Sequence, residues 1–577
     1  MKKLLCLLVV CVMAISCLVA CSQSAATTAG GEGSSATTAN ASAKSAVPEY
    51  LNLATDLPVV KSGFDIPLKI AVLHTPDFGK IEDSHFWNFV KQKMNIKVEV
   101  EQVFNRDEYV NITFAANSLP DVMIGMNITA VMQMNYGVME KQLLPLTKYI
   151  NQEYMPNLQA IYDLYPEYKA TVTAPNGEIY SFGSYMDATN PSMYPKRQMN
   201  TKWLKEANLS YPSTLDEFTA VLKTFKDRAA NIVPLGGSFA VENPFYIILN
   251  AFGYVTADST GKSAALRNNK VVIPAGDREV YGEVLKLLND YYNKGYITKD
   301  FYTLDQTATR ALVAENRVGV IATDAFISLP KPEGFQQYET MPPLTSKYST
   351  SKFAVINPSL TTGGYVISAA CKYPEAAIRF ANYCLGDEGS NMSWVGAVRG
   401  SENLLPGWGG WYLDEKYSRL DVDRVANPDK WPNAVEYLRK RVAGFNMGAI
   451  NSAINEFTWR PKANGLAPRN MYEVWKASPT NGDFWFRPSV VDNLMPYVTD
   501  GFPSILFFSK ADNERITELS SVLGAHIDAE NAKFITGARA LTDAELNKYY
   551  EELDALGFKE YLKYYQTAYD NYIKNLK

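Results

Sequence analysis

Early in the globular part of the chain, segments in which apolar and polar residues alternate are followed by segments in which apolar residues have helical spacing. This pattern predicts strands and helices in alternation. The segment Pro67–Leu73 has the pattern of a strand, Phe86–Met94 has helical spacing, and Ile96–Val100 alternates like a second strand. A helix over Asp107–Asn117 and a buried strand over Asp121–Ile124 follow. This succession predicts an α/β sheet, in which ligands gather at the carboxyl ends of the strands.

Asn127 lies just past the last of these strands and is therefore a candidate for ligand contact. Its neighbours Gly125 and Met126 share this position. A simple turn from strand to helix accounts for each of the three equally well.

A later segment carries the signal for the start of a helix. Thr214 precedes Leu215, and its side-chain oxygen can accept from a free helix amide while Glu217 completes a capping box. The residues on one face of this helix are apolar, as is an earlier Trp-Leu pair, so we expect all of them in a core. They are Phe218, Val221, Leu222 and Phe225, with Trp203 and Leu204.

The N-terminus has a different pattern, with a short apolar run between a positive start and a cysteine. Lys2 and Lys3 precede the run Leu4–Leu18, which is shorter than the roughly 20 apolar residues of a spanning helix and has the layout of a secretory signal. The residues Leu18–Cys21 resemble the bacterial lipobox. That resemblance implies that residues 1–20 are a signal peptide and that Cys21 becomes the N-terminus of the mature protein. The lipid attached to Cys21 would include palmitate. An ordinary cleaved signal, or Cys17 as the acceptor, remains the alternative.

Residues 21–47 are expected to form a flexible leash, since the stretch after Cys21 consists almost entirely of Ser, Ala, Thr and Gly.

Four of the 6 cysteines lie in the leader, which leaves Cys371 and Cys384 as two buried thiols or a single bridge. The net charge is -5 at pH 7, so nothing in the composition points to nucleic acid. With 47% hydrophobic residues and 577 residues in all, the chain can bury more than one core.

A series of motifs occurs in the same order as in the family 1 extracellular solute-binding proteins, the receptor components of sugar-importing ABC transporters. The chain resembles the large lipid-anchored members of that family over nearly all of residues 66–577. The motifs are Ser118–Met123, Leu143–Ile150, Asn176–Tyr180, Asn200–Leu204, Tyr211–Phe218, Tyr373–Ala377 and Tyr561–Asp570.

This resemblance implies a two-lobed α/β fold of the periplasmic-binding-protein type II, with hinge crossovers and extra C-terminal helices. The first lobe would comprise residues 48–190 plus about 366–440, and the second residues 191–365 plus about 441–577. It further implies a monomer that captures an oligosaccharide between its lobes and delivers it to ABC permease subunits. Such a receptor is not an enzyme, and it needs no cofactor and no metal. Its place is outside the cytoplasm, anchored by lipid to the cell membrane, with a Gram-positive surface favoured by the long leash.

Aromatic residues are the chemically informative part of the composition, because sugars stack their flat faces on aromatic planes and offer hydroxyls to polar groups. The chain has 9 Trp, 36 Tyr and 26 Phe. Trp394 and the glycine-rich pair Trp408 and Trp411 are expected either in the cleft or in the core, with the two alternatives equally open. Trp485 is intermediate between them, and Trp431 and Trp475 are closer to core.

Similarity to the maltose-binding members of the family implies further contacts. Glu242 and Phe245 resemble an acid and a stacking ring in the second lobe, although Phe245 replaces a tyrosine and an Asn is inserted. Asp324 or Phe326 would follow the strand that carries another sugar-facing residue. The expected ligand-binding set is Asn127, Tyr185, Asp187, Glu242, Phe245, Asp324, Phe326, Trp394, Trp408, Trp411 and Trp485, with Tyr185 and Asp187 near the hinge.

Two other classes of function remain open on the sequence alone. A cell-surface carbohydrate-active enzyme needs a pair of carboxylates, and Glu388 and Asp414 lie near tryptophans, but no acid stands in a catalytic motif. The three histidines have no metal-ligand spacing. The same fold could also bind a peptide or report to a sensor kinase, while the abundance of Trp and Tyr favours a saccharide.

Overall fold

The first of two mixed sheets forms from the strands at the start of the globular chain. In the computed structural model, which describes residues 47–75, 78–186, 196–355, 360–431, 434–445, 448–453, 456–467 and 470–577, this sheet has the order β11-β3-β1-β2. Strand β1 pairs in parallel with β2 and β3, and β11 runs antiparallel to β3. The strands are β1 (Pro67–Leu73), β2 (Lys97–Val103), β3 (Val122–Ile124) and β11 (Tyr365–Ile367).

The α/β succession expected for this region is confirmed, with small shifts at the ends of elements. β1 has the predicted bounds, and β2 runs further than predicted, to Val103. Alternate residues of β1, namely Leu68, Ile70 and Val72, are buried in the first core. The helices of this lobe are α1 (His85–Lys93), α2 (Arg106–Ala115), α4 (Pro156–Leu164), α5 (Pro166–Val172), α13 (Pro374–Leu385) and α14 (Asp387–Trp394).

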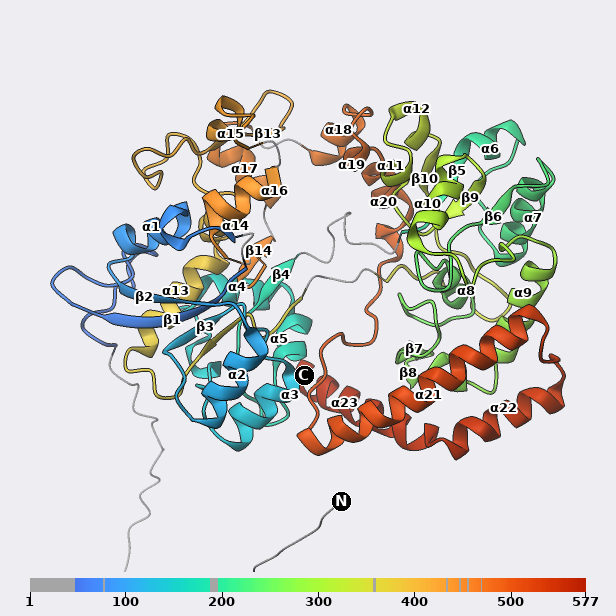
Figure 1. The fold of residues 1–577 in the computed structure, drawn as a ribbon, viewed down its shortest axis with the longest axis horizontal. Coiled ribbons are helices and arrows are strands. Elements are labelled where there is room, and N and C mark those ends of the chain that lie inside the picture. The colour runs from blue at the N-terminus through green and yellow to red at the C-terminus, as the bar shows by residue number, and fades with distance from the viewer. Residues whose placement is uncertain are drawn as a thin grey trace, which may run out of the picture. The chain divides into compact units, whose positions relative to one another are not determined.

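A second sheet, with its own core, occupies the other lobe (Figure 1). Its order is β10-β5-β9-β6, in which β6 and β9 are parallel and β5 is antiparallel to both β9 and β10. These strands are β5 (Gln198–Asn200), β6 (Val233–Leu235), β9 (Val318–Ile321) and β10 (Tyr338–Thr340). The accompanying helices are α6 (Thr201–Glu206), α7 (Leu215–Lys226), α8 (Phe245–Ala251), α9 (Tyr281–Asn293), α10 (Gln306–Ala314), α11 (Ala325–Ser328) and α12 (Pro332–Phe335).

The chain returns to the first lobe after β11 and stays there longer than the sequence suggested. The expected boundary was about residue 441, but Phe445 and Ile450 pack in the first core. The reason is a parallel pairing between β14 (Asn451–Ala453) and β4 (Ser184–Met186), which holds this segment against the first lobe. Here too lie β12 (Trp411–Leu413), β13 (Arg419–Asp421), α15 (Val422–Ala426), α16 (Ala434–Tyr437) and α17 (Glu456–Ala463).

Long C-terminal helices cover the second core and also contact the first lobe. They are α21 (Lys510–Thr536), α22 (Asp543–Ala555) and α23 (Phe558–Leu576), preceded by α18 (Met471–Lys476), α19 (Gly482–Trp485) and α20 (Arg487–Asn493). Leu523, Phe534 and Tyr549 are buried in the second core. At the far end of α23, Asn575 donates to the carbonyl oxygen of Thr173 in the first lobe at 3.0 Å. The extra C-terminal helices expected from the sequence are thus present, and they contact both lobes.

The segment that follows Val47 is fixed to the first lobe. Tyr50 donates from its hydroxyl to Glu375 at 3.0 Å, and the guanidinium of the buried Arg379 donates to Asp56 at 3.1 Å. The residues before Val47, including Cys21, the signal and nearly all of the leash, lie outside the described residues. Cys371 and Cys384 are both buried and free, which excludes the bridge between them. Among the described residues, none of the helices combines the length and the apolar character needed to span a bilayer.

The predicted capping box at the start of α7 is present and gives a first test of the fold. The Thr214 hydroxyl accepts from the Glu217 amide at 3.2 Å. We expect Thr214→Ala to lower the free energy of unfolding by about 1 kcal/mol, because a helix amide loses its acceptor. Thr224→Ala, within the same helix, removes no cap and is the control. Equal urea denaturation midpoints for the two variants would contradict this role of the cap.

His85 makes stability depend on pH. The side chain is 2% exposed, and burial, with a contribution from the charge of Arg441, lowers its pKa from 6.5 to about 4. The His85 imidazole takes up a proton at higher pH in the unfolded chain than in the folded protein. The free energy of unfolding is therefore at its full value above pH 6.5 and falls as the pH drops towards 4. Relative to His85→Gln, the native protein should lose about 3 kcal/mol over this range in urea titrations. A parallel loss in both proteins would show that His85 is not the cause.

Candidate functional site

A charged pair stands where the second sheet ends. Asp324 follows β9 and precedes α11, and its carboxylate accepts from the Lys196 ammonium group at 3.2 Å. The side chains are 13% and 26% exposed, so the pair is accessible at its edge. Gln198 in β5 fixes the position of this turn, donating to Asp324 at 3.3 Å and accepting from the Ala325 amide at 2.9 Å.

Aromatic rings lie beside this pair, with Phe486 buried and Phe326 and Trp485 half-buried. Phe326 and Phe486 are stacked with their centroids 6.3 Å apart and their planes at 6°, and the Lys196 Nζ lies 5.2 Å from the Phe486 ring centre. The Trp485 indole donates to the carbonyl oxygen of Tyr338 at 2.8 Å, which fixes its ring beside β10. We refer to Lys196, Asp324, Phe326, Trp485 and Phe486 as the second-lobe wall.

The structure therefore brings together three predicted site residues, Asp324, Phe326 and Trp485. Lys196 and Phe486 are additional members that the sequence reasoning did not select. Phe486 had a signal, because it adjoins Trp485 in an aromatic run. Lys196 had none, since it meets Asp324 only through the fold.

Glu242 and Phe245 form a neighbouring group in the same lobe. The Glu242 carboxylate accepts from Arg310 at 2.8 Å, and the Glu242 backbone has φ 55°, a conformation that is strained for this residue type. Phe245 is 5% exposed and stacks on Phe301 at 4.7 Å, so its ring lies in the second core. The next residue, Tyr246, donates from its hydroxyl to the carbonyl oxygen of Lys196 and so connects this group to the second-lobe wall.

The predicted tryptophans of the first lobe differ in burial. Trp411 is fully buried and donates to the Gly396 carbonyl at 2.8 Å, which places it in the core. Trp394, at the end of α14, is half-buried and packs against the same cluster. Trp408 is also half-buried, with the Arg441 guanidinium 3.4 Å from its ring centre and the His85 ring edge-on at 5.0 Å.

The remaining predicted residues lie near the ends of first-lobe strands. Asn127 is exposed at φ 48° just after β3, and its carbonyl oxygen accepts from Arg106 at 2.7 Å. Tyr185, in β4, is fully buried and shares a hydrogen bond of 2.8 Å with Tyr162. Burial raises the pKa of the Tyr185 phenol, so the group stays neutral. Asp187 lies outside the described residues.

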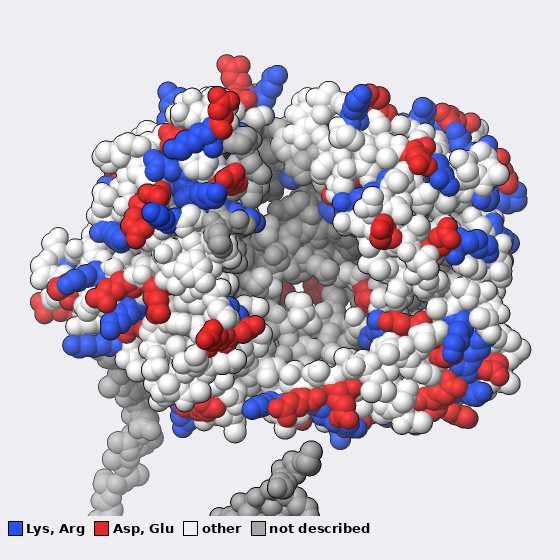
Figure 2. Space-filling model, in the orientation of Figure 1, with Lys and Arg blue, Asp and Glu red and all other residues white. Residues whose placement is uncertain are grey.

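The available side chains suit the binding of a polar, uncharged molecule with flat apolar faces. The aromatic rings can stack on a flat face of a ligand, and the Lys196–Asp324 pair can form hydrogen bonds with it. Because the two charges of this pair cancel, the ligand itself need not be charged. Within the part of the chain that the structure describes, no group of three or more His, Cys, Asp or Glu could hold a metal ion. The face in Figure 2 is hollowed between the lobes, and positive and negative side chains are interspersed over it.

Comparison with known proteins agrees with this geometry. Residues 75–391 match the family described as bacterial extracellular solute-binding protein. The fructooligosaccharide ABC transporter substrate-binding protein FusA of Streptococcus pneumoniae serotype 4 is 24% identical over 491 residues, 81% of this chain and 82% of FusA. Lipoprotein LipO of Bacillus subtilis is 28% identical over 156 residues, 25% of this chain and 29% of LipO.

Solved structures share the fold. FusA of S. pneumoniae in complex with kestose has a TM-score of 0.57 at 21% identity, covering 88% of this chain and 100% of that one. An HMO-binding, ABC-transporter-associated solute-binding protein from Bifidobacterium longum infantis has a TM-score of 0.60 at 17% identity, covering 88% of this chain and 99% of that one. These matches confirm the two-lobed α/β fold class. The chain belongs to the bacterial extracellular solute-binding protein family and is a binding protein, not an enzyme.

Proposed function

We propose that this protein captures an oligosaccharide between its two lobes and delivers it to the permease of an ABC transporter. The observation that carries the proposal is the second-lobe wall, where the half-buried Phe326 ring, stacked on the buried Phe486, lies beside the partly exposed Lys196–Asp324 pair. A sugar ring can stack its C–H face on the Phe326 ring while its hydroxyls bond to the ammonium and carboxylate groups. Because the two charges cancel, the wall favours neutral sugars over ionic ligands.

The relatives support the class of ligand and partner. FusA is named for fructooligosaccharide and for an ABC transporter, and it aligns with most of this chain. The structural relatives include FusA in complex with kestose and an HMO-binding solute-binding protein. We infer an oligosaccharide, ABC permease subunits as partners and a monomeric receptor.

Of the predicted residues, the exposed or half-buried ones are the proposed ligand contacts. Asn127, Trp394 and Trp408 would serve from the first lobe, and Glu242 would supplement the second-lobe wall. The buried rings of Tyr185, Phe245 and Trp411 would support the site from behind, and Asp187 remains proposed at the hinge. Closure of the lobes would be driven by contacts that exist only when both lobes touch the sugar.

A lipid anchor at Cys21 is the proposed means of retention outside the cell. It rests on the lipobox pattern Leu18–Cys21, and the similarity to LipO is in keeping with it. Since Tyr50 and Asp56 are fixed to the first lobe, the leash would hold that lobe and leave the second free to close. The long leash favours a Gram-positive surface.

We expect Asp324→Asn to weaken oligosaccharide binding about tenfold, because a charged acceptor is lost. Phe326→Ala should produce a similar loss by removing a stacking plane. Calorimetric titration with fructo-, malto- and xylo-oligosaccharides measures the effect. Asp290→Asn on α9, which breaks an exposed ion pair with Lys294 just past the end of that helix, is the matched control and should retain affinity. Unchanged affinity in both wall variants would remove the wall from the site.

Replacement of Cys21 tests the anchor. Cys21→Ser should release the protein from the membrane fraction and abolish labelling by radioactive palmitate, because no thiol is left to carry the lipid. Cys17→Ser is the control and should remain bound and labelled. If Cys21→Ser is retained and Cys17→Ser is released, the acceptor is Cys17 instead.

A further inference from the structure

A cavity lies in the second lobe, between the loop after α8 and the C-terminal helices. It has a volume of about 770 Å³ and is lined by residues 255–258 and 262–264, the segment 501–506, and side chains of α21 and α23. This volume is within the range of about 300–1,000 Å³ that is usual for ligand sites. We call it the basin.

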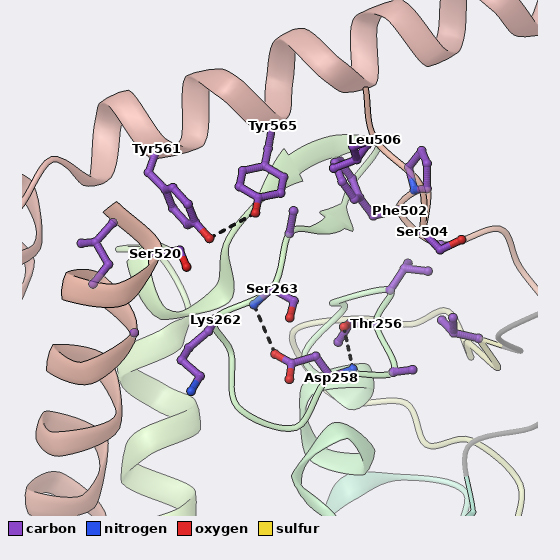
Figure 3. A pocket seen from close by; sticks show the side chains of 18 of the residues that line it. Thr256, Asp258, Lys262, Ser263, Phe502, Ser504, Leu506, Ser520, Tyr561 and Tyr565 are labelled. Carbon is purple, nitrogen blue, oxygen red and sulfur yellow. Dashed lines mark hydrogen bonds between the residues drawn. The ribbon is translucent and has the colours of Figure 1, made fainter. Parts of the chain in front are cut away.

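Aromatic side chains form one side of the basin. Figure 3 shows Tyr561 and Tyr565 projecting from α23 with Phe502 beside them. The two tyrosine hydroxyls share a hydrogen bond of 3.1 Å and point into the basin. One shared bond leaves a hydroxyl proton and several lone pairs for a ligand. This side therefore offers both a ring surface and hydrogen-bonding groups.

The opposite side is polar. Asp258 accepts from the Ser263 amide at 3.3 Å and from Thr260, so its carboxylate is held in place by the loop. Ser263 and Ser520 also line the basin, and within the described residues neither hydroxyl has a hydrogen-bond partner. Lys262 also lines the basin, and its ammonium group pairs with Asp528 at 2.6 Å. The polar groups are therefore hydroxyls, one carboxylate and an ammonium group already paired with a carboxylate, a set suited to sugar hydroxyls.

One stretch of chain connects the basin with the second-lobe wall. Val355 lines the basin, and the preceding residue, Ala354, packs in the same cluster as Phe486. The Thr499 amide donates to the Ala354 carbonyl at 3.1 Å, which ties the start of the 501–506 segment to this point. The same stretch of chain thus lines the basin and packs against the cluster that holds Phe486 of the second-lobe wall.

We propose that the basin is a distal subsite for further units of the oligosaccharide whose other end lies at the second-lobe wall. This rests on the proposed function. The consequence is a preference for longer chains, because each extra sugar that reaches the basin adds ring stacking and hydrogen bonds. A short sugar would bind at the wall alone.

The test compares the affinity for fructo-, malto- and xylo-oligosaccharides of increasing length, from about two to eight sugar units. The longest of these sugars are longer than one ordinary ligand pocket. Ser520→Trp fills the basin, and Ser521→Trp is its matched control, because Ser521 is the adjacent residue of α21, exposed and outside the basin lining. Phe502→Ala is a second variant that removes a ring instead of adding one. Calorimetry gives the dissociation constants.

We expect the native protein and Ser521→Trp to gain about tenfold in affinity as the chain lengthens, and Ser520→Trp and Phe502→Ala to lose that gain while keeping the affinity for short sugars. Equal affinity for all lengths in the native protein, or a length dependence that survives in both basin variants, overturns the subsite and leaves the proposed function intact. Absence of binding across every ladder in the native protein overturns the proposed function and the subsite together.

Discussion

The division of apolar burial between two separate cores is the constraint on which the rest of this structure depends. Each core forms around its own sheet, so the chain must cross between lobes, and the polar turns at the ends of the strands are left outside the cores. Asp324 occupies such a turn after β9 and Asn127 another after β3. Residues at these turns can contact a ligand without disturbing the packing that holds either lobe together.

The second-lobe wall and the basin consist of the same two kinds of group, aromatic rings and polar side chains. At the wall, the Lys196–Asp324 pair is partly exposed and neutral as a unit, and the half-buried Phe326, stacked on the buried Phe486, supplies the apolar surface. In the basin, Asp258 and serine hydroxyls face the tyrosines of α23. Both places combine rings with oriented polar groups, and the C-terminal helices that complete the basin also reach the first lobe through Asn575.

The sequence predicted features that depend on local pattern and missed those that depend on long-range packing. The bounds of β1, the cap at Thr214 and the buried face of α7 follow from neighbouring residues, and the structure confirms them. Lys196 meets Asp324 and Phe486 across wide separations in sequence, which no spacing rule reveals. The residues that flank Trp411 in the sequence are equally compatible with a position in the cleft or in the core. Only the fold shows that its ring is fully buried.

Native mass spectrometry of the full-length protein with a mixture of oligosaccharides and peptides tests the central claim most directly. The account predicts a complex with a single intact oligosaccharide, released unchanged when the complex is dissociated, and no peptide adduct. A complex with peptide only, the absence of any sugar adduct, or release of a cleaved sugar would contradict it.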